Sequence, residues 1–212
     1  MSKYKLKRNN LGRGWVLGET LITGIGQGYI QTTPLQLCLM TAQIANGGYK
    51  IKPKIIVNDD PLSLENAKTA MELQSLQTPN TKLFNDSKNI KIVQEAMFSS
   101  TNEQFGTSYR SRIDDPKYQF AGKTGTAQVK RISKRERELD LKLEQIPYKD
   151  RDHALYVAYG PYKNPRYALS IIIEHGGSGS KAAAPMAKEL FKLIIDRDEL
   201  RDNQSNFENI NI

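Results

Sequence analysis

Cysteine and histidine are scarce in this sequence of 212 residues, and their scarcity excludes several kinds of site. Cys38 is the single cysteine, so neither an internal disulfide nor a cysteine-based zinc site can form. Cys38 lies in the apolar run of residues 35–40, which predicts a buried, unreactive thiol. Two histidines, His153 and His175, are too few for a metal cluster. We therefore expect neither a bound metal nor a cofactor.

Long apolar runs are also missing from the chain. No segment approaches the roughly 18 consecutive apolar residues that a membrane-spanning helix needs. Residues 1–10 are basic, but no apolar run follows them, so they predict neither a signal peptide nor a membrane anchor.

The overall composition, with 38% hydrophobic and 25% charged residues, is ordinary for one soluble domain with a core. The net charge of +8 suits an anionic polymer, an anionic membrane surface or a nucleic acid equally well, and also a plain solvated surface. Nucleic acid is not an expected partner, because the sequence contains no recognisable nucleic-acid-binding motif.

Helical patterns occur in three places. Pro34 follows Thr33 at a favourable first position, and apolar residues then predict a buried helix that ends at residues 46–48, Asn-Gly-Gly. Apolar residues at helical spacing predict further helices over residues 88–100 and 182–196, with a loop over 101–119. Residues 49–57 alternate lysine with apolar residues, contain a proline and predict a short edge strand.

Three more strands are predicted, over residues 120–129, 153–159 and 167–174. The last two are joined by GPYKNPR, whose glycine, prolines and asparagine favour a turn, so they should form an antiparallel hairpin. Residues 130–150 form a charged insert between the first two of these strands. Mixed charges there predict a solvated, partly helical loop, with contact to substrate or to a cell-wall partner as an alternative.

The sharpest chemical signal is the tetrapeptide Lys123-Thr124-Gly125-Thr126. Alternate residues of a strand point the same way, so Thr124 and Thr126 should share one face and could jointly bind a carboxylate. Gly125 carries no side chain and lets a ligand backbone approach closely. Lys123 adds positive charge for an anionic substrate and can assist proton transfer.

The surrounding sequence makes this tetrapeptide more specific. K-T-G is one of three motifs that serine penicillin-binding proteins and β-lactamases share, beside S-x-x-K and S-x-N. Three segments in the order of the family are GETLITGIGQGYIQTTPLQL, AGKTGTAQV and HALYVAYGPYKNPRYALSIIIEHGGSGSKAAAPMAKEL. With them the chain resembles the penicillin-binding protein 2 branch of the serine D,D-transpeptidase family, over roughly residues 11–195.

The resemblance implies an α/β fold of the β-lactamase-like, penicillin-binding transpeptidase type, with helices flanking an antiparallel sheet. It also implies peptidoglycan cross-linking by acyl transfer from D-Ala-D-Ala stem peptides, with β-lactams acylating the same serine. Lys123 and Thr126 would be catalytic, and Thr124, Gly125 and Thr126 would bind the substrate, with the Thr126 N–H as an oxyanion-hole donor. Members of the family are anchored in the inner membrane and carry a periplasmic catalytic domain.

The other two motifs of the family have no match in the expected place. S-x-x-K fits residues 2–5 and 178–181, and S-x-N fits residues 87–89 and 100–102, at about the chance rate. Residues 2–5 lie at a terminus that is expected to be frayed, and residues 178–181 follow the KTG motif in a glycine-rich turn. Neither S-x-N match precedes the GIGQGY segment as in the family, so we assign the chain no nucleophile. Residues 1–212 are therefore expected to be the C-terminal portion of a transpeptidase domain, with an incomplete fold.

Two hypotheses about activity follow. In the first, the chain is a transpeptidase segment that needs the S-x-x-K and S-x-N portion, supplied by its own gene or by a separate chain. In the second, it is a remnant or a binding module without acyl chemistry. In both, the chain alone should be inactive. The glycines of residues 24–28 lack the flanking residues of a nucleotide-binding loop, and both histidines are expected to be strand-end hydrogen-bonding residues.

Overall fold

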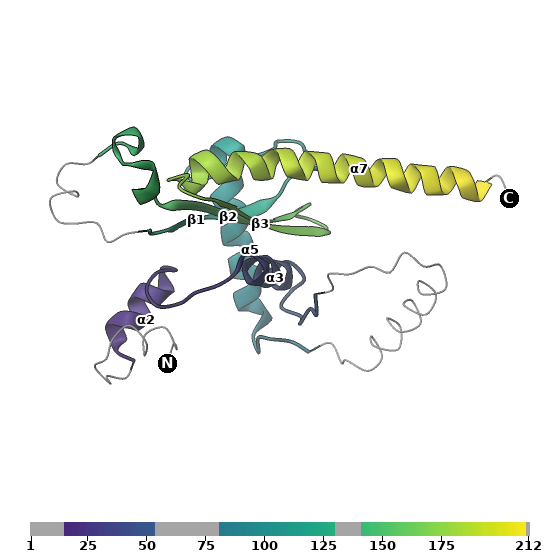
Figure 1. Ribbon diagram of the computed structural model, residues 1–212. Coiled ribbons are helices and arrows are strands. Elements are labelled where there is room, and N and C mark those ends of the chain that lie inside the picture. Colours follow the sequence, from purple (N-terminus) through teal and green to yellow (C-terminus); the bar gives the residue numbers. More distant parts are fainter. Residues whose placement is uncertain (1–14, 54–80, 130–140, 211–212) are drawn as a thin grey trace.

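A three-stranded antiparallel sheet lies at the centre of the computed structural model, which describes residues 15–53, 81–129 and 141–210. The strands are β1 (Ala121–Ala127), β2 (His153–Gly160) and β3 (Tyr167–Ile173), in the order β1-β2-β3. One face of the sheet is covered by α7 (Ala184–Ile210), and the other side by α3 (Pro34–Ala45) and α5 (Ser87–Asn102) (Figure 1). The predicted α/β arrangement of helices on an antiparallel sheet is confirmed.

All three strands predicted over residues 120–174 are present, with ends that agree within two residues. The predicted hairpin is confirmed as well, because β2 pairs antiparallel with β3 from Ala154 opposite Ile173 to Gly160 opposite Tyr167. The N–H of Arg166 donates to the carbonyl of Gly160 at 3.0 Å and closes the connection between the two strands.

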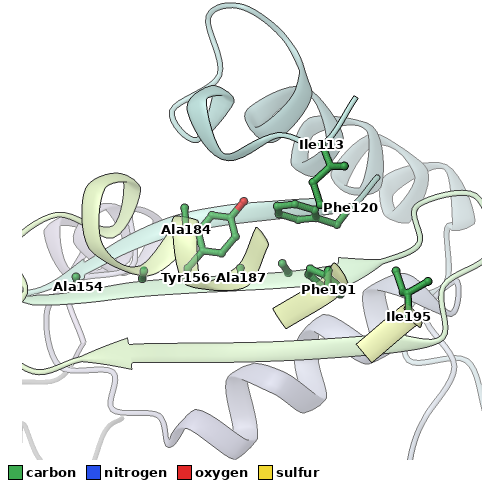
Figure 2. Packing of buried hydrophobic residues seen from close by; sticks show 10 residues of the cluster. Ile113, Phe120, Ala154, Tyr156, Ala184, Ala187, Phe191 and Ile195 are labelled. Atoms are coloured by element: carbon green, nitrogen blue, oxygen red, sulfur yellow. The ribbon is translucent and has the colours of Figure 1, made fainter. Parts of the chain in front are cut away.

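The main core fills the space between the sheet and α7 (Figure 2). Phe120 stacks on Phe191 of α7 with ring centroids 4.9 Å apart and meets Tyr156 of β2 edge to face at 6.5 Å. Ala184 and Ala187 of α7 are fully buried beside these rings. Their small side chains allow the helix to lie close to the sheet.

A smaller core lies on the opposite face, where α3 and α5 meet the sheet. It is built on Met97 of α5, Ala121 of β1 and Tyr159 of β2, with Ile44 of α3 packed against them. The side-chain amide of Gln94 ties the two helices together by donating to the carbonyl of Ile44 at 2.7 Å.

The α3 and α5 helices begin where the sequence predicts. Thr33 caps α3, since its hydroxyl accepts from the Gln36 N–H at 3.2 Å while the Gln36 side chain accepts from the Thr33 N–H at 2.8 Å. Asp86 caps α5 by accepting from the Lys88 N–H at 2.8 Å. The predicted burial of α3 is wrong, because Thr41 is its single buried residue. α3 covers β3 with one side, and its other side faces solvent in the described part of the chain.

Cys38 is half-buried on this helix, and its thiol lies 3.3 Å from the carbonyl of Ala168 on β3. Burial raises the pKa of the Cys38 thiol, which lowers its thiolate fraction and hence its reactivity. The predicted unreactive character of this thiol therefore agrees with its surroundings, although its burial is less complete than expected.

The structure differs from the sequence-based expectations in three places. No strand forms over residues 49–53, where Tyr49 makes an isolated bridge to Lys82; residues 54–57 of that prediction lie outside the described ranges. A helix not expected from the sequence, α2 (Leu17–Gly24), precedes the glycines and has no buried residue. α7 begins after a π-helical turn, Gly179–Ala183, and continues far past the predicted end at residue 196.

One side of β3 pairs with no other strand among the described residues, and this leads to a prediction about association. β3 ends the sheet order, and Ile172 on it is 38% exposed. Edge strands with unpaired backbone groups and β-branched side chains promote pairing between chains. We expect the purified chain to self-associate, and Ile172→Lys to shift it toward the monomer in size-exclusion chromatography with light scattering.

Leu193→Lys is the matched control, because Leu193 is a more exposed apolar residue, 66% exposed, on α7. It should leave the association unchanged. A monodisperse monomer for the unaltered chain, or an equal effect of both substitutions, would contradict association through β3.

Candidate active site

The KTGT tetrapeptide lies in the middle of β1, at the edge of the sheet. Lys123 is paired with Val157 and Thr126 with Ala154 on β2, and no strand among the described residues pairs with the other side of β1. Lys123 and Thr126 are exposed, whereas Thr124 and Gly125 are half-buried. The motif therefore presents polar side chains and backbone groups along an accessible strand edge.

The register places the two threonine side chains on one face of the sheet. Thr124 lies opposite Tyr156 and Thr126 opposite Ala154, and both partners belong to the core under α7. Gly122 is on the same face: a Cβ there would lie 2.4 Å from the Tyr156 hydroxyl oxygen. Lys123 and Gly125 alternate with these residues and so face the other side.

Lys123 contacts the residue that follows it. Its Nζ lies 3.0 Å from the carbonyl oxygen of Thr124 and 3.4 Å from the Thr124 hydroxyl. No carboxylate among the described residues pairs with this ammonium group, so its charge is available to an anionic ligand. The hydroxyl of Thr124 in turn lies 3.2 Å from that of Thr107, and the Thr107 hydroxyl lies 3.3 Å from that of Ser100.

Beneath the strand, the buried hydroxyl of Tyr156 connects β2 to the end of α5. It lies 2.9 Å from the Thr101 hydroxyl and 3.0 Å from the Ser108 hydroxyl. Burial raises the pKa of Tyr156, so this side chain stays neutral and makes hydrogen bonds as a phenol. These contacts could not be predicted from the sequence, because Thr101 at the end of α5 and Ser108 in the following loop are far from Tyr156 along the chain.

The glycine-rich turn before α7 packs directly on the motif. A Cβ on Gly179 would lie 2.3 Å from the Leu155 carbonyl oxygen and 2.7 Å from that of Gly125, so no other residue fits there without a shift. The chain's own backbone thus makes the close approach on this side of Gly125. Ser178 and Lys181 match S-x-x-K by letter, but the Ser178 hydroxyl lies 3.0 Å from that of Ser180, and Lys181 is exposed.

The two S-x-N matches and the histidines take part in the fold itself. In the S-x-N match at residues 100–102, the Asn102 side chain donates to the carbonyls of Phe98 at 3.0 Å and Phe120 at 2.9 Å. The match at residues 87–89 opens α5. The predicted role of His153 is confirmed, because it begins β2 and its Nδ1 accepts from the His175 N–H at 2.9 Å. His175 also makes hydrogen bonds, but it lies in the turn after β3 and not at the end of the strand.

Two kinds of feature are absent from the described ranges. No group of three or more histidine, cysteine, aspartate or glutamate side chains is placed to hold a metal ion. No helix in the same ranges is long and apolar enough to cross a membrane.

The family follows from comparison with known sequences. A family model described as the penicillin binding protein transpeptidase domain matches residues 2–192. The chain belongs to this family. The predicted resemblance is therefore confirmed, and with it the assignment of the fold to a partial penicillin-binding transpeptidase domain.

Curated relatives of this penicillin-binding transpeptidase segment include the peptidoglycan D,D-transpeptidase MrdA of two species. This chain is 34% identical to the Salmonella typhimurium protein, over 87% of the chain and 28% of the relative. It is 37% identical to the Acinetobacter baumannii protein, over 84% of the chain and 24% of the relative. The chain thus spans about a quarter of the length of these relatives.

Solved structures of penicillin-binding protein 2 resemble this chain as well. The Helicobacter pylori protein in complex with MreC aligns with a TM-score of 0.63 at 32% identity, over 90% of this chain and 30% of that one. The Pseudomonas aeruginosa protein in complex with WCK 5153 aligns with a TM-score of 0.62 at 33% identity, over 91% of this chain and 37% of that one.

The packing around Gly122 leads to a prediction about how the strand that carries the motif affects stability. Gly122→Ala forces a methyl group against the Tyr156 hydroxyl and its bonds to Thr101 and Ser108. We expect a loss of about 1–3 kcal/mol in the free energy of unfolding, measured by urea denaturation at low protein concentration.

Gly125→Ala is the control on the same strand, since its Cβ would lie at an ordinary 3.4 Å from the Cβ of Leu155. This variant should unfold at the same urea concentration as the unaltered chain. Equal losses for both variants would show that strand glycines in general, and not the contact with Tyr156, set the stability.

Proposed function

We propose that the chain forms the carboxylate-binding part of a serine D,D-transpeptidase domain, which cross-links peptidoglycan by acyl transfer from D-Ala-D-Ala stem peptides. The observation that carries this proposal is the KTGT edge of β1, where an ammonium group with no carboxylate partner in the described chain lies 3.4 Å from the Thr124 hydroxyl, and Thr126 follows on the same face of the strand. Charged hydrogen bonds of this kind suit a terminal carboxylate.

Each residue of the motif has a proposed role in that reaction. The hydroxyls of Thr124 and Thr126 bind the terminal carboxylate of the stem peptide, and Gly125 lets its backbone approach β1. The N–H of Thr126 donates to the oxyanion that develops when the scissile carbonyl is attacked. Lys123 contributes positive charge and assists proton transfer. β-Lactams carry a comparable carboxylate and are proposed to use the same groups.

The nucleophile is proposed to come from sequence outside residues 1–212, in the same gene product or in a separate chain. The S-x-x-K match at residues 178–181 supports this, because its serine pairs with Ser180 and its lysine is exposed. An activated serine needs a base within hydrogen-bond reach. The complete protein is proposed to be anchored in the inner membrane with this domain in the periplasm, as in the family.

One prediction concerns the chain by itself. Residues 1–212 should not be acylated when incubated with a fluorescent penicillin and separated on a denaturing gel, because their sequence has no S-x-x-K serine in the family's position before the GIGQGY segment. A complete penicillin-binding protein provides the positive control. A stoichiometric covalent band on the chain would contradict the proposal, and mapping the label would identify the serine responsible.

A second prediction concerns Thr126 in the complete domain, with the S-x-x-K and S-x-N segment present. Thr126→Val removes a hydroxyl that binds the carboxylate and should slow β-lactam acylation. A hydrogen bond to a charged group contributes roughly 1.5–3 kcal/mol, which corresponds to about a ten- to hundred-fold lower rate if it is felt in the transition state. Thr126→Ser keeps the hydroxyl and should remain close to the parent rate. An unchanged rate for Thr126→Val would mean that the carboxylate binds elsewhere.

A further inference from the structure

A short chain of hydroxyl groups leads from α5 to the motif. Ser100 lies in the last turn of α5, Thr107 lies in the loop that follows, and Thr124 lies on β1. The oxygen of Thr107 is 3.3 Å from that of Ser100 and 3.2 Å from that of Thr124, while Nζ of Lys123 is 3.4 Å from the Thr124 oxygen. Thr107 is outside the tetrapeptide and 17 residues before Thr124 in the chain.

The direction of these hydrogen bonds decides what the Thr124 hydroxyl can do. A threonine hydroxyl has one hydrogen to donate and two lone pairs that accept. An ammonium group only donates, so Lys123 must occupy one of the Thr124 lone pairs. If Thr107 donates to the other, the hydrogen of Thr124 points away from both neighbours. It is then free for an anion at the open edge of β1.

The opposite direction would disable the site. If Thr124 donated to Thr107, its single hydrogen would be used inside the protein, and a carboxylate would meet only an oxygen lone pair. Ser100 is compatible with the productive direction, because its hydroxyl can donate to Thr107 and leave the Thr107 hydrogen for Thr124. Successive donors in such a chain also polarise one another in the same sense.

The loop that carries Thr107 is held on both sides of this residue. A Cβ on Gly106 would lie 2.4 Å from the Ser100 carbonyl oxygen and 2.5 Å from that of Ser99, so the loop lies directly on the end of α5. On the other side, the N–H and the hydroxyl of Ser108 both donate to the Ser100 carbonyl at 3.0 Å. The Ser108 hydroxyl also lies 3.0 Å from the buried Tyr156 hydroxyl. The position of Thr107 is therefore fixed relative to β1.

We propose that Thr107 is a positioning residue for the reaction: its hydroxyl donates to Thr124 and orients the Thr124 hydroxyl as a donor toward the substrate carboxylate. This role rests on the proposed carboxylate site. Thr107 itself does not contact the substrate, so its effect must pass through Thr124. Its side chain is exposed, and substitutions there leave the core in place.

The test is a double-mutant cycle in the complete domain. The second-order rate of acylation by a fluorescent penicillin is measured for the parent, Thr107→Val, Thr124→Val and the double variant, together with the thermal midpoint of each. Thr107→Val keeps the shape but removes the donor, and should lower the rate roughly three- to ten-fold, the size expected for a neutral hydrogen bond. In the Thr124→Val background the same substitution should change the rate less than about two-fold, because the coupled partner is absent.

Thr107→Ser tests the role of the hydroxyl independently of the shape of the side chain. It should restore the parent rate, whereas a role confined to holding the loop would be served as well by valine. Thr107→Ala also removes the hydroxyl, but without a branched side chain in its place. Its acylation rate should equal that of Thr107→Val if the thermal midpoints of both variants agree with the parent.

The outcomes separate this inference from the proposed function. A slower Thr124→Val together with a parent-like Thr107→Val would overturn the positioning role alone. Equal losses from Thr107→Val in both backgrounds would also overturn it, since the residue would then act without Thr124. A parent-like rate for Thr124→Val would overturn both the role of Thr124 in carboxylate binding and the inference that depends on it.

Discussion

The buried hydroxyl of Tyr156 is the constraint on which the geometry of the site depends. A buried hydroxyl without a partner costs about 1–3 kcal/mol, so the end of α5 and the loop after it must present acceptors and donors to β2. Thr101 and Ser108 do so, and Gly122 leaves the room that the tyrosine ring needs. The packing between α5 and the sheet is thereby fixed at the point where β1 carries its polar motif.

The motif itself combines two requirements that few positions in a fold can meet. Lys123 needs to remain without a carboxylate partner, and the threonines need a rigid backbone under hydroxyls that solvent can reach. A strand at the edge of a sheet meets both, because one side of β1 is hydrogen-bonded to β2 and the other pairs with no strand in the described part of the chain. Gly179 adds rigidity by bringing the turn before α7 onto the backbone at Gly125. The accessible side of the strand is then the side available to an extended ligand.

The sequence predicts the parts of this arrangement that are local. The three strands, the hairpin and the start of α3 follow from alternation, turn residues and a proline after a capping threonine. α7 runs past its predicted end because apolar periodicity stops near residue 196, whereas no glycine or proline follows to end the helix. The bridge from Tyr49 to Lys82 and the contact of Thr101 with Tyr156 join segments far apart in the chain. No spacing within one segment indicates such contacts, so Thr107 could not be found from the sequence.

The proposed binding of the carboxylate does not depend on the residues that would carry out the proposed acyl transfer. The contacts that shape the proposed carboxylate-binding edge involve Thr101, Ser108, Tyr156 and Gly179, all within the described residues. None of them needs a nucleophile to be in place. Hydroxyls held by such contacts before a ligand arrives lose little freedom on binding, and preorganised donors contribute more to catalysis than mobile ones. The edge of β1 is therefore preformed for the proposed carboxylate, and in the proposed reaction the remaining requirement is a serine within reach of the scissile carbonyl.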